Sequence, residues 1–445
     1  MADQKRIARV PAERERRSAE RYTGRYLMTF EPGQTSQVVA DLSQQGIQPA
    51  KPVSSSAAVA KSLPRGHHLL FPNIGVALID PLAEHEDSLI QIASSQPAIS
   101  ALEPERLNRG FQEQVWQPYM RGWKDAIDLL YEHLLPQPAE SESAGAEAAA
   151  AKAKAEKEYT WGLAATKVPG CRFSGNGIKI AVLDTGFDQA LSDFAGRHLH
   201  VQNFVGDEKP FHDGVGHGTH CTGTACGTAH PQKGPRYGIA SDCEIYAGRV
   251  LDDNGRGGDG NILQGIDWAV GQGCQIISLS LGAPWQPGDP PFMLAYEVAA
   301  RRALAAGCLL VVAAGNDASN PLLAGAVGTP GNSPSVLTVA ALDESLATAP
   351  FSNRATPRAP GVKGPDLAGP GVNVYSSWPG GAFRRLSGTS MATPHVAGIA
   401  ALYAEQDKSL RGQALKEALL DHCQTLSDNA ARVGEIGRGM VQAPG

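Results

Sequence analysis

Three polar residues of this sequence have the types needed to turn a serine hydroxyl into a nucleophile. Asp184 closes an apolar run (KIAVLD), His217 lies between glycines in GVGHGTH, and Ser390 lies in SGTSMATPHVAG. A serine hydroxyl is a poor nucleophile at neutral pH, so an imidazole must take its proton and return it to the leaving group. A carboxylate fixes the tautomer of that imidazole and stabilises its charged form. The set predicts nucleophilic hydrolysis through Ser390.

A fourth residue, Asn316, follows another apolar run in VAAGND. An asparagine at the end of a strand is usually a turn residue. Here its amide NH2 could donate a hydrogen bond to an oxyanion, together with the backbone N–H of Ser390. An apolar helix beginning at Ser390 would add positive potential at the same point. We therefore predict Asp184, His217, Ser390 and Asn316 as the catalytic residues.

The elements that must position these residues belong to an α/β pattern in the second part of the chain. Strand-like apolar runs alternate there with helical stretches, and the runs cover 179–184, 244–251, 275–282, 308–315 and 336–342. Nearly continuous apolar runs fit strands buried on both faces of a parallel sheet. Ligand sites in such sheets lie beyond the carboxyl ends of the strands. We expect an α/β fold with a parallel sheet, helices on both of its faces, and the candidate residues at strand ends.

An earlier region has the order β-α-β-β-α-β, which predicts a small ferredoxin-like α+β domain. The expected elements are a strand at 26–30, a helix at 38–42, a strand-turn-strand at 68–79, a helix at 86–94 and a last strand at 99–102. Many unrelated domains share this plan, so the pattern alone indicates no function.

The remaining segments are less regular. The arginine-rich N-terminus is interpreted as a solvated, disordered tail rather than a binding arm. Apolar residues recur at helical spacing over 118–135, which predicts an amphipathic helix that packs against another part of the protein. Binding of a partner protein by this helix is the weaker alternative. The Ala/Glu/Lys-rich stretch 139–157 is interpreted as a flexible linker. The chain is divided into 1–23 (disordered basic tail), 24–109 (small α+β domain), 110–158 (helical insertion and linker) and 159–445 (α/β domain).

Composition excludes several classes of function. The 445 residues carry a net charge of −6 without a basic stripe, so no nucleic-acid partner is expected. No apolar run reaches the roughly 20 residues that cross a bilayer, so no membrane partner is expected either. The charged N-terminus lacks the apolar stretch of a secretory signal, which favours the cytoplasm unless a signal was removed or export is non-standard. The seven cysteines form no CxxC pair, so they are expected to pack as small apolar groups, with disulfides left open if the protein is exported.

The motifs together resemble the subtilase family, in which the catalytic residues follow the order Asp, His, Ser. The matching strings are VLDTG at 182–186, GHGTH at 216–220, AAGN at 313–316 and GTSMATPHVAG at 388–398. Cys221 and the stretch PDLAGPG are most similar to the proteinase K branch, and residues 25–108 resemble the inhibitory propeptide of these enzymes. The resemblance implies a subtilisin-like fold and a serine endopeptidase made as a self-processing zymogen, with an acyl-enzyme formed on Ser390.

The resemblance also implies where a substrate would bind. The substrate would add an extended strand between two enzyme segments, and small side chains would line a roomy pocket for the residue on the amino side of the scissile bond (P1). This implies broad specificity with a preference for large apolar P1 residues. The implied substrate-binding residues are Gly257, Gly258, Ser280, Leu281, Gly282, Ala283, Ala313, Ala314, Gly315 and Gly328.

A structural calcium ion is implied in the same way. Its ligands would be the carboxylate of Asp366 and the backbone carbonyls of Pro334 and Val336, oxygen ligands that suit Ca²⁺. No organic cofactor is expected. The expected partners are protein or peptide substrates and the chain's own propeptide as an intramolecular inhibitor, and the protein is expected to be a monomer.

Two alternatives stay open. The chain could be a latent binding protein whose propeptide never leaves, or a narrow maturation protease for one intracellular peptide. About 50 residues separate Arg109 from Trp161, so the sequence leaves the cleavage point undecided.

Overall fold

The computed structural model describes residues 6–8, 21–31, 33–44, 46–49, 63–110, 158–206 and 209–445. The predicted helix over 118–135 and the predicted linker over 139–157 lie outside the described residues.

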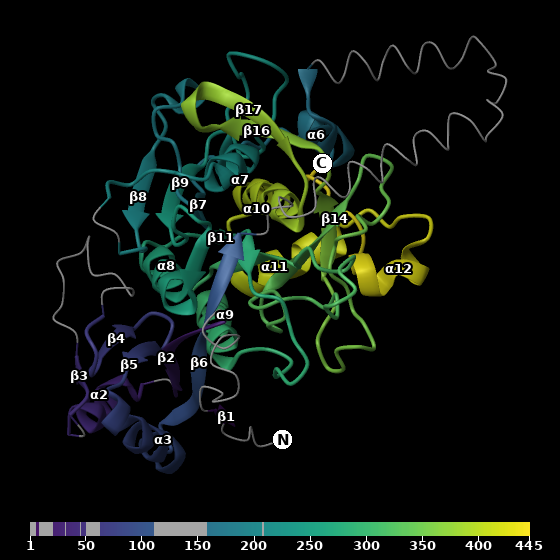
Figure 1. The fold of residues 1–445 in the computed structure, drawn as a ribbon. Coiled ribbons are helices and arrows are strands. Elements are labelled where there is room, and N and C mark those ends of the chain that lie inside the picture. Colours follow the sequence, from purple (N-terminus) through teal and green to yellow (C-terminus); the bar gives the residue numbers. More distant parts are fainter. Residues whose placement is uncertain are drawn as a thin grey trace, which may run out of the picture.

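The second part of the chain forms a seven-stranded sheet with the strand order β15-β14-β13-β11-β7-β9-β8, and every pair in it is parallel (Figure 1). The strands are β7 (Lys179–Asp184), β8 (Leu199–Asn203), β9 (Glu244–Arg249), β11 (Ile276–Leu279), β13 (Leu309–Ala313), β14 (Leu337–Leu342) and β15 (Leu367–Pro370). The predicted parallel sheet is confirmed. The sequence missed β8 and β15, which are the two edge strands and have the weakest apolar runs.

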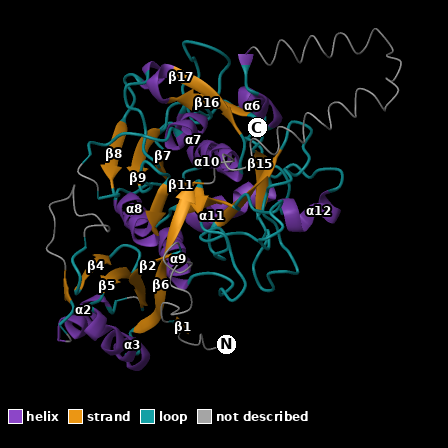
Figure 2. Ribbon diagram, viewed as in Figure 1, coloured by secondary structure: helices purple, strands orange, loops and turns teal. Residues whose placement is uncertain are grey.

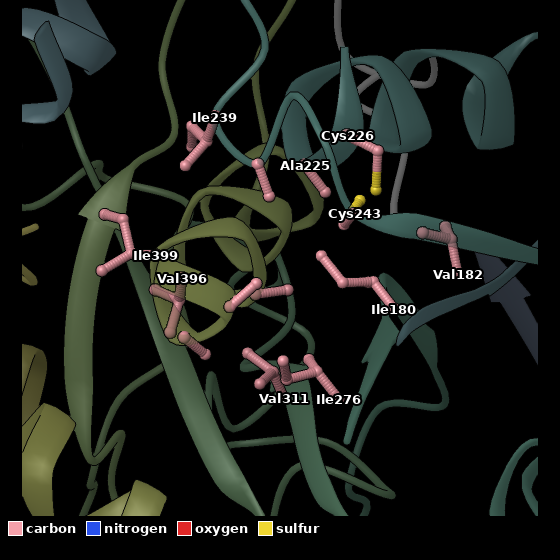
Figure 3. Packing of buried hydrophobic residues seen from close by; sticks show 14 of the residues in the cluster. Ile180, Val182, Ala225, Cys226, Ile239, Cys243, Ile276, Val311, Val396 and Ile399 are labelled. Carbon is pink, nitrogen blue, oxygen red and sulfur yellow. The ribbon is translucent and has the colours of Figure 1, made fainter. Parts of the chain in front are cut away.

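Helices cover both faces of this sheet because its strands are apolar on both faces. In β7, Ile180 and Val182 face one core while Ala181 and Leu183 face the other. The first core contains α7 (His217–Cys226), α10 (Thr389–Gln406) and α11 (Gly412–Asp421); the second contains α8 (Asp259–Gly271) and α9 (Leu294–Ala305). Figure 3 shows the first core, in which sheet residues such as Val311 point toward Val396 of α10. All seven cysteines are free thiols.

The earlier region forms a second sheet with two helices of its own. The elements are β1 (Arg6–Ile7), β2 (Tyr22–Phe30), α2 (Thr35–Gln44), β3 (Gln48–Pro49), β4 (His67–Phe71), β5 (Val76–Asp80), α3 (Glu86–Ser95) and β6 (Ile99–Gly110). Their order along the chain contains the expected β-α-β-β-α-β pattern, and the strand order is β1-β6-β2-β5-β4-β3. Tyr26 and Met28 pack against α2 and α3, whereas Leu27 and Leu78 join the core of α8 and α9. Figure 2 shows α8 and α9 between the two sheets.

Strand β6 is much longer than predicted. The sequence indicated a strand over 99–102 only, but β6 continues to Gly110. The added part pairs antiparallel with β10 (Arg256–Gly258) on one side and β12 (Leu281–Gly282) on the other. A pattern read along the chain could not reveal this extension, because its hydrogen-bonding partners come from the other sheet's connections.

The predicted disordered tail is wrong for the residues of it that are described, 6–8 and 21–23. Arg6 and Ile7 form β1, which pairs parallel with β6, and the Arg6 guanidinium donates to the carbonyl of Phe292 at 2.8 Å. Tyr22 and Thr23 begin β2. Along the described ranges, no helix combines the length and apolarity required to span a membrane.

Candidate active site

The structure brings Asp184, His217 and Ser390 together at the carboxyl edge of the parallel sheet. Asp184 is the last residue of β7, His217 is the first residue of α7, and Ser390 lies in the first turn of α10. His217 Nδ1 lies 2.7 Å from Asp184 Oδ1, so the imidazole donates its Nδ1–H to the carboxylate. All three residues have 0% of their surface exposed. This contact leaves Nε2 as the imidazole nitrogen that can accept a proton.

Asp213 holds the start of α7 in place, and the sequence analysis missed it. Its carboxylate accepts hydrogen bonds from the backbone N–H of Gly216 at 2.7 Å and of Thr219 at 2.8 Å, which caps the helix. It also accepts one from the hydroxyl of Thr185 at 2.8 Å, which ties the helix to the loop after β7. An acidic residue shortly before a helix start is a signal that could have identified it.

The Ser390 hydroxyl makes no hydrogen bond to the imidazole in this arrangement. It donates to the carbonyl of Ser280 at 2.9 Å, and the Ser280 hydroxyl donates back to the Ser390 carbonyl at 2.8 Å. Within the described part of the chain, His217 Nε2 has no hydrogen-bond partner. The Ser390 hydroxyl must therefore exchange its hydrogen bond to Ser280 for one to His217 Nε2 before its proton can pass to His217.

Asn316 is oriented by its neighbour Thr389. Its amide oxygen accepts hydrogen bonds from both the backbone N–H and the hydroxyl of Thr389, each at 2.9 Å. The Thr389 hydroxyl in turn accepts from the Gly315 N–H at 3.1 Å. Because the oxygen is committed in this way, the NH2 group is the part of the amide that can serve an oxyanion.

The two histidines of α7 differ in their electrostatics. Burial lowers the pKa of His217, but the adjacent Asp184 carboxylate outweighs burial, with a further contribution from Cys221, and the pKa stands well above 6.5. Burial, with a smaller contribution from the charge of His217, lowers the pKa of His220 to about 3. His220 is therefore neutral at physiological pH, and its Nε2–H donates to the Val374 carbonyl at 3.0 Å.

The segments predicted to bind substrate flank an extended strand of the chain itself. The end of β6 lies between β10 and β12, with Gly257 opposite Asn108 and Gly282 opposite Arg109. The N–H of Gly110 donates to the carbonyl of Gly255 at 3.1 Å. A Cβ on Gly110 would lie 3.6 Å from His217 Nδ1, so the main chain of this strand passes beside the imidazole.

The predicted pocket residues also come together next to this strand. The N–H of Gly328 donates to the carbonyl of Ala314 at 3.0 Å, and the backbones of Ala283 and Thr329 exchange hydrogen bonds of 2.8 and 2.9 Å. A Cβ on Gly328 would lie only 2.6 Å from the Ala283 carbonyl oxygen, so glycine is required at this point. Small side chains and backbone groups therefore line the region predicted to bind the P1 side chain.

The predicted calcium ligands do not fit an ion. Asp366, Pro334 and Val336 do lie together, but lysine ammonium groups bind their oxygen atoms. Lys416 Nζ donates to the carbonyls of Pro334 at 3.2 Å and Val336 at 2.8 Å, and Lys363 Nζ donates to Asp366 Oδ2 at 2.7 Å. The placement of calcium on these residues is therefore corrected, because a cation already fills the site.

This fold and site define a serine endopeptidase. Residues 175–439 match the model of the subtilase family. M-protease of Shouchella clausii (strain KSM-K16) is 34% identical over 289 residues, which cover 64% of this chain and 68% of that protein. Subtilisin Savinase of Lederbergia lenta is also 34% identical, over 96% of its length, and subtilisin E of Bacillus subtilis (strain 168) is 33% identical over 64% of its length. The chain belongs to the subtilase family.

Proposed function

We propose that this chain cleaves peptide bonds through an acyl-enzyme on Ser390. His217 Nε2 takes the hydroxyl proton as Ser390 attacks the carbonyl carbon, and then returns it to the leaving amine. Asp184 keeps the proton on Nδ1 and stabilises the imidazolium. The Asn316 NH2 and the Ser390 N–H stabilise the oxyanion. A water molecule then attacks the acyl carbon while His217 Nε2 takes its proton, and His217 returns that proton to Ser390 Oγ as the bond to the acyl group breaks. The observation that carries this proposal is the 2.7 Å contact between His217 and Asp184, beside the end of β6.

For the P1 residue, we propose a broad preference for large apolar side chains. Support comes from the small side chains of Ala283 and Ala314 and from the glycine at 328, which leave room for a P1 side chain beside the end of β6. Burial raises the pKa of Asp317, next to this region, and Asn353 donates to its carboxylate at 3.2 Å. That carboxylate is already engaged, which gives little reason to expect a strict requirement for a basic P1 residue.

The predicted propeptide role is proposed for residues 24–109. Its support is the interface with α8 and α9. Glu103 accepts the N–H groups of Leu294 and Ala295 at the start of α9, each at 2.9 Å, and Glu105 accepts the N–H of Gly260 at 2.8 Å at the start of α8. Carboxylates at helix N-termini are favourable. With β6 between β10 and β12, a substrate would have to displace this strand.

The register of β6 allows the processing point to be proposed. Gly110 donates to the Gly255 carbonyl and lies against His217 and Leu251. A substrate residue bound in the position of Gly110 would therefore be the second residue before the scissile bond. The following residue in the sequence is Phe111, a large apolar side chain of the kind proposed for P1. We therefore propose self-cleavage of the Phe111–Gln112 bond.

Intact mass and an active-serine label test these proposals together. Purified wild type is incubated beside Ser390→Ala, and both are treated with a fluorophosphonate probe. We expect wild type to yield a labelled fragment that begins at Gln112, while Ser390→Ala yields neither fragment nor label. A labelled fragment with another N-terminus contradicts the proposed bond but keeps the endopeptidase. Full-length, unlabelled wild type supports the latent binding protein instead.

Substitution of Phe111 is predicted to slow processing. Phe111→Asp should lengthen the half-time of self-cleavage by about 100-fold or more, since burying an unpaired carboxylate in an apolar pocket costs several kcal/mol. Phe111→Tyr keeps the ring and serves as the matched control, with a half-time close to wild type. Gel densitometry after refolding measures both. Equal half-times for Asp and Phe would show that residue 111 is not P1.

Removal of the Asn316 amide is predicted to act on kcat. Asn316→Ala should lower kcat about 10²–10³-fold with little change in KM, because the donor is needed chiefly in the transition state. Asn176→Ala, at an exposed loop position, is the control and should leave both constants unchanged. Steady-state hydrolysis of a peptide anilide gives the values. A rise in KM with unchanged kcat would instead assign Asn316 to ground-state binding.

A further inference from the structure

A second cluster of charged side chains, partly buried, lies away from the active site, where β14 begins. The carbonyls of Pro334 and Val336 and the carboxylate of Asp366 point at one place, and two lysines reach it. Lys363 comes from the loop just before Asp366, and Lys416 comes from α11, 80 residues after Val336. Lys416 is only 8% exposed. A lysine buried to this degree is rare unless its ammonium group is fully used.

Each of the two ammonium groups uses two of its three N–H donors in this cluster. Lys416 Nζ donates to the Pro334 and Val336 carbonyls at 3.2 and 2.8 Å. Lys363 Nζ donates to the same Val336 carbonyl at 3.1 Å and to Asp366 Oδ2 at 2.7 Å. Asp366 Oδ2 also accepts the N–H of Thr338 at 2.7 Å. The two ammonium groups thus bind both carbonyl oxygens and one carboxylate oxygen of the groups that the family resemblance assigned to calcium.

The surrounding charges balance these two cations. Glu297 of α9 is 6% exposed and accepts the N–H and hydroxyl of Ser335, the residue between the two carbonyls, at 2.9 and 2.7 Å. The side chain of Arg301 lies 3.4 Å from Glu297 and is more than half exposed, which limits its share in the balance. Burial lowers the pKa of Lys363, while Asp366 raises it and Lys416 lowers it. Glu297 raises the pKa of Lys363 as well, so that the two carboxylates, Asp366 and Glu297, offset the two ammonium groups of this cluster.

We infer that Lys363 and Lys416 replace a metal ion in this protein, so that the turn at 334–336 is held by built-in cations. Calcium binds oxygen at about 2.3–2.6 Å and needs six or more ligands. Nitrogen atoms at hydrogen-bond distance from the same oxygens occupy that space and repel a divalent cation. Two ammonium groups supply the same total charge as Ca²⁺, but they are attached covalently and do not depend on the calcium concentration.

Thermal unfolding tests this inference in the full chain. All variants carry Ser390→Ala to prevent self-digestion, and each Tm is measured in EDTA and in millimolar calcium. The parent and Asp366→Asn should show the same difference in Tm between the two media, whatever calcium does elsewhere in the chain. Lys416→Met should unfold about 5 °C or more below the parent in both media, because it removes the lysine donor of the Pro334 carbonyl and one of the two lysine donors of the buried Val336 carbonyl. Lys408→Met, at an exposed position, should match the parent.

Two results would overturn the inference. One is a calcium-dependent rise in the parent's Tm that Asp366→Asn abolishes, which would show that an ion uses this carboxylate. The other is a Tm for Lys416→Met equal to that of the parent, which would show that the ammonium group holds nothing. If Asp366→Asn does not fold, the comparison of Lys416→Met with Lys408→Met still decides.

Discussion

Ser390→Ala is expected to lower kcat for a peptide anilide by about 10⁶-fold. The loss is this large because the remaining groups have no nucleophile to activate. The residual rate comes from the oxyanion donors and from substrate binding, so KM should change little. Since the variant cannot cut itself, hydrolysis has to be measured on chain that was processed in trans by a small amount of wild type, which is then inactivated with a fluorophosphonate.

Ser409→Ala is the matched control for this loss. Ser409 is exposed, and its hydroxyl donates to the nearby carboxylate of Asp407 at 2.7 Å. Its kcat should equal that of wild type. Activity of Ser390→Ala within tenfold of wild type would remove Ser390 from the role of nucleophile and direct attention to another residue of the cleft.

Asp184→Asn is expected to lower kcat by about 10⁴-fold at neutral pH. An amide at this position can donate to His217 Nδ1, which favours the tautomer with its proton on Nε2, and that tautomer cannot accept the proton of Ser390. The pH dependence of activity should change as well. Asp184 raises the pKa of His217 above 6.5, and activity needs neutral His217, so the acid limb of kcat/KM in wild type should lie above pH 6.5. In Asp184→Asn the limb should move to lower pH.

Profiles of kcat/KM between pH 5 and 10 measure both effects. Asp242→Asn, an exposed change at the amino-terminal side of β9, should leave the rate and the limb in place. An acid limb that does not move in Asp184→Asn would mean that the Asp184 charge does not control the titration of His217.

The sequence was sufficient for the parts of the site that are set locally. Asp184 ends a strand, and His217 and Ser390 lie at the start of a helix; parallel strands bring such positions to one edge of a sheet. The strand run ending in Asp184 was predicted with its observed bounds, 179–184. The glycines noted on both sides of His217 include Gly216, whose φ of 93° lies in the left-handed region that glycine adopts readily.

The sequence was insufficient wherever the partner is distant along the chain. Nothing within residues 99–110 indicates that Asn108 will lie opposite Gly257, so β6 was expected to end early. Lys416 looks like an ordinary polar residue of an amphipathic helix, and only the fold directs it to the carbonyl of Val336. The weak edge strand Leu199–Asn203 was missed for a related reason, since β9 supplies its pairing.

The path of β6 makes the N-terminal sheet and the cleft one continuous hydrogen-bonded surface. If the bond after Phe111 is cut as proposed, hydrolysis removes one covalent link and none of the hydrogen bonds between β6 and β10 or β12. The released N-terminal fragment would therefore stay bound and compete with substrates for the same segments. The core of this N-terminal domain contains few side chains, among them Tyr26, Met28 and Ile79. Domains with such small cores are marginally stable. The duration of latency would then be governed by how often this small domain unfolds, so that temperature and external proteases set the timing of activity.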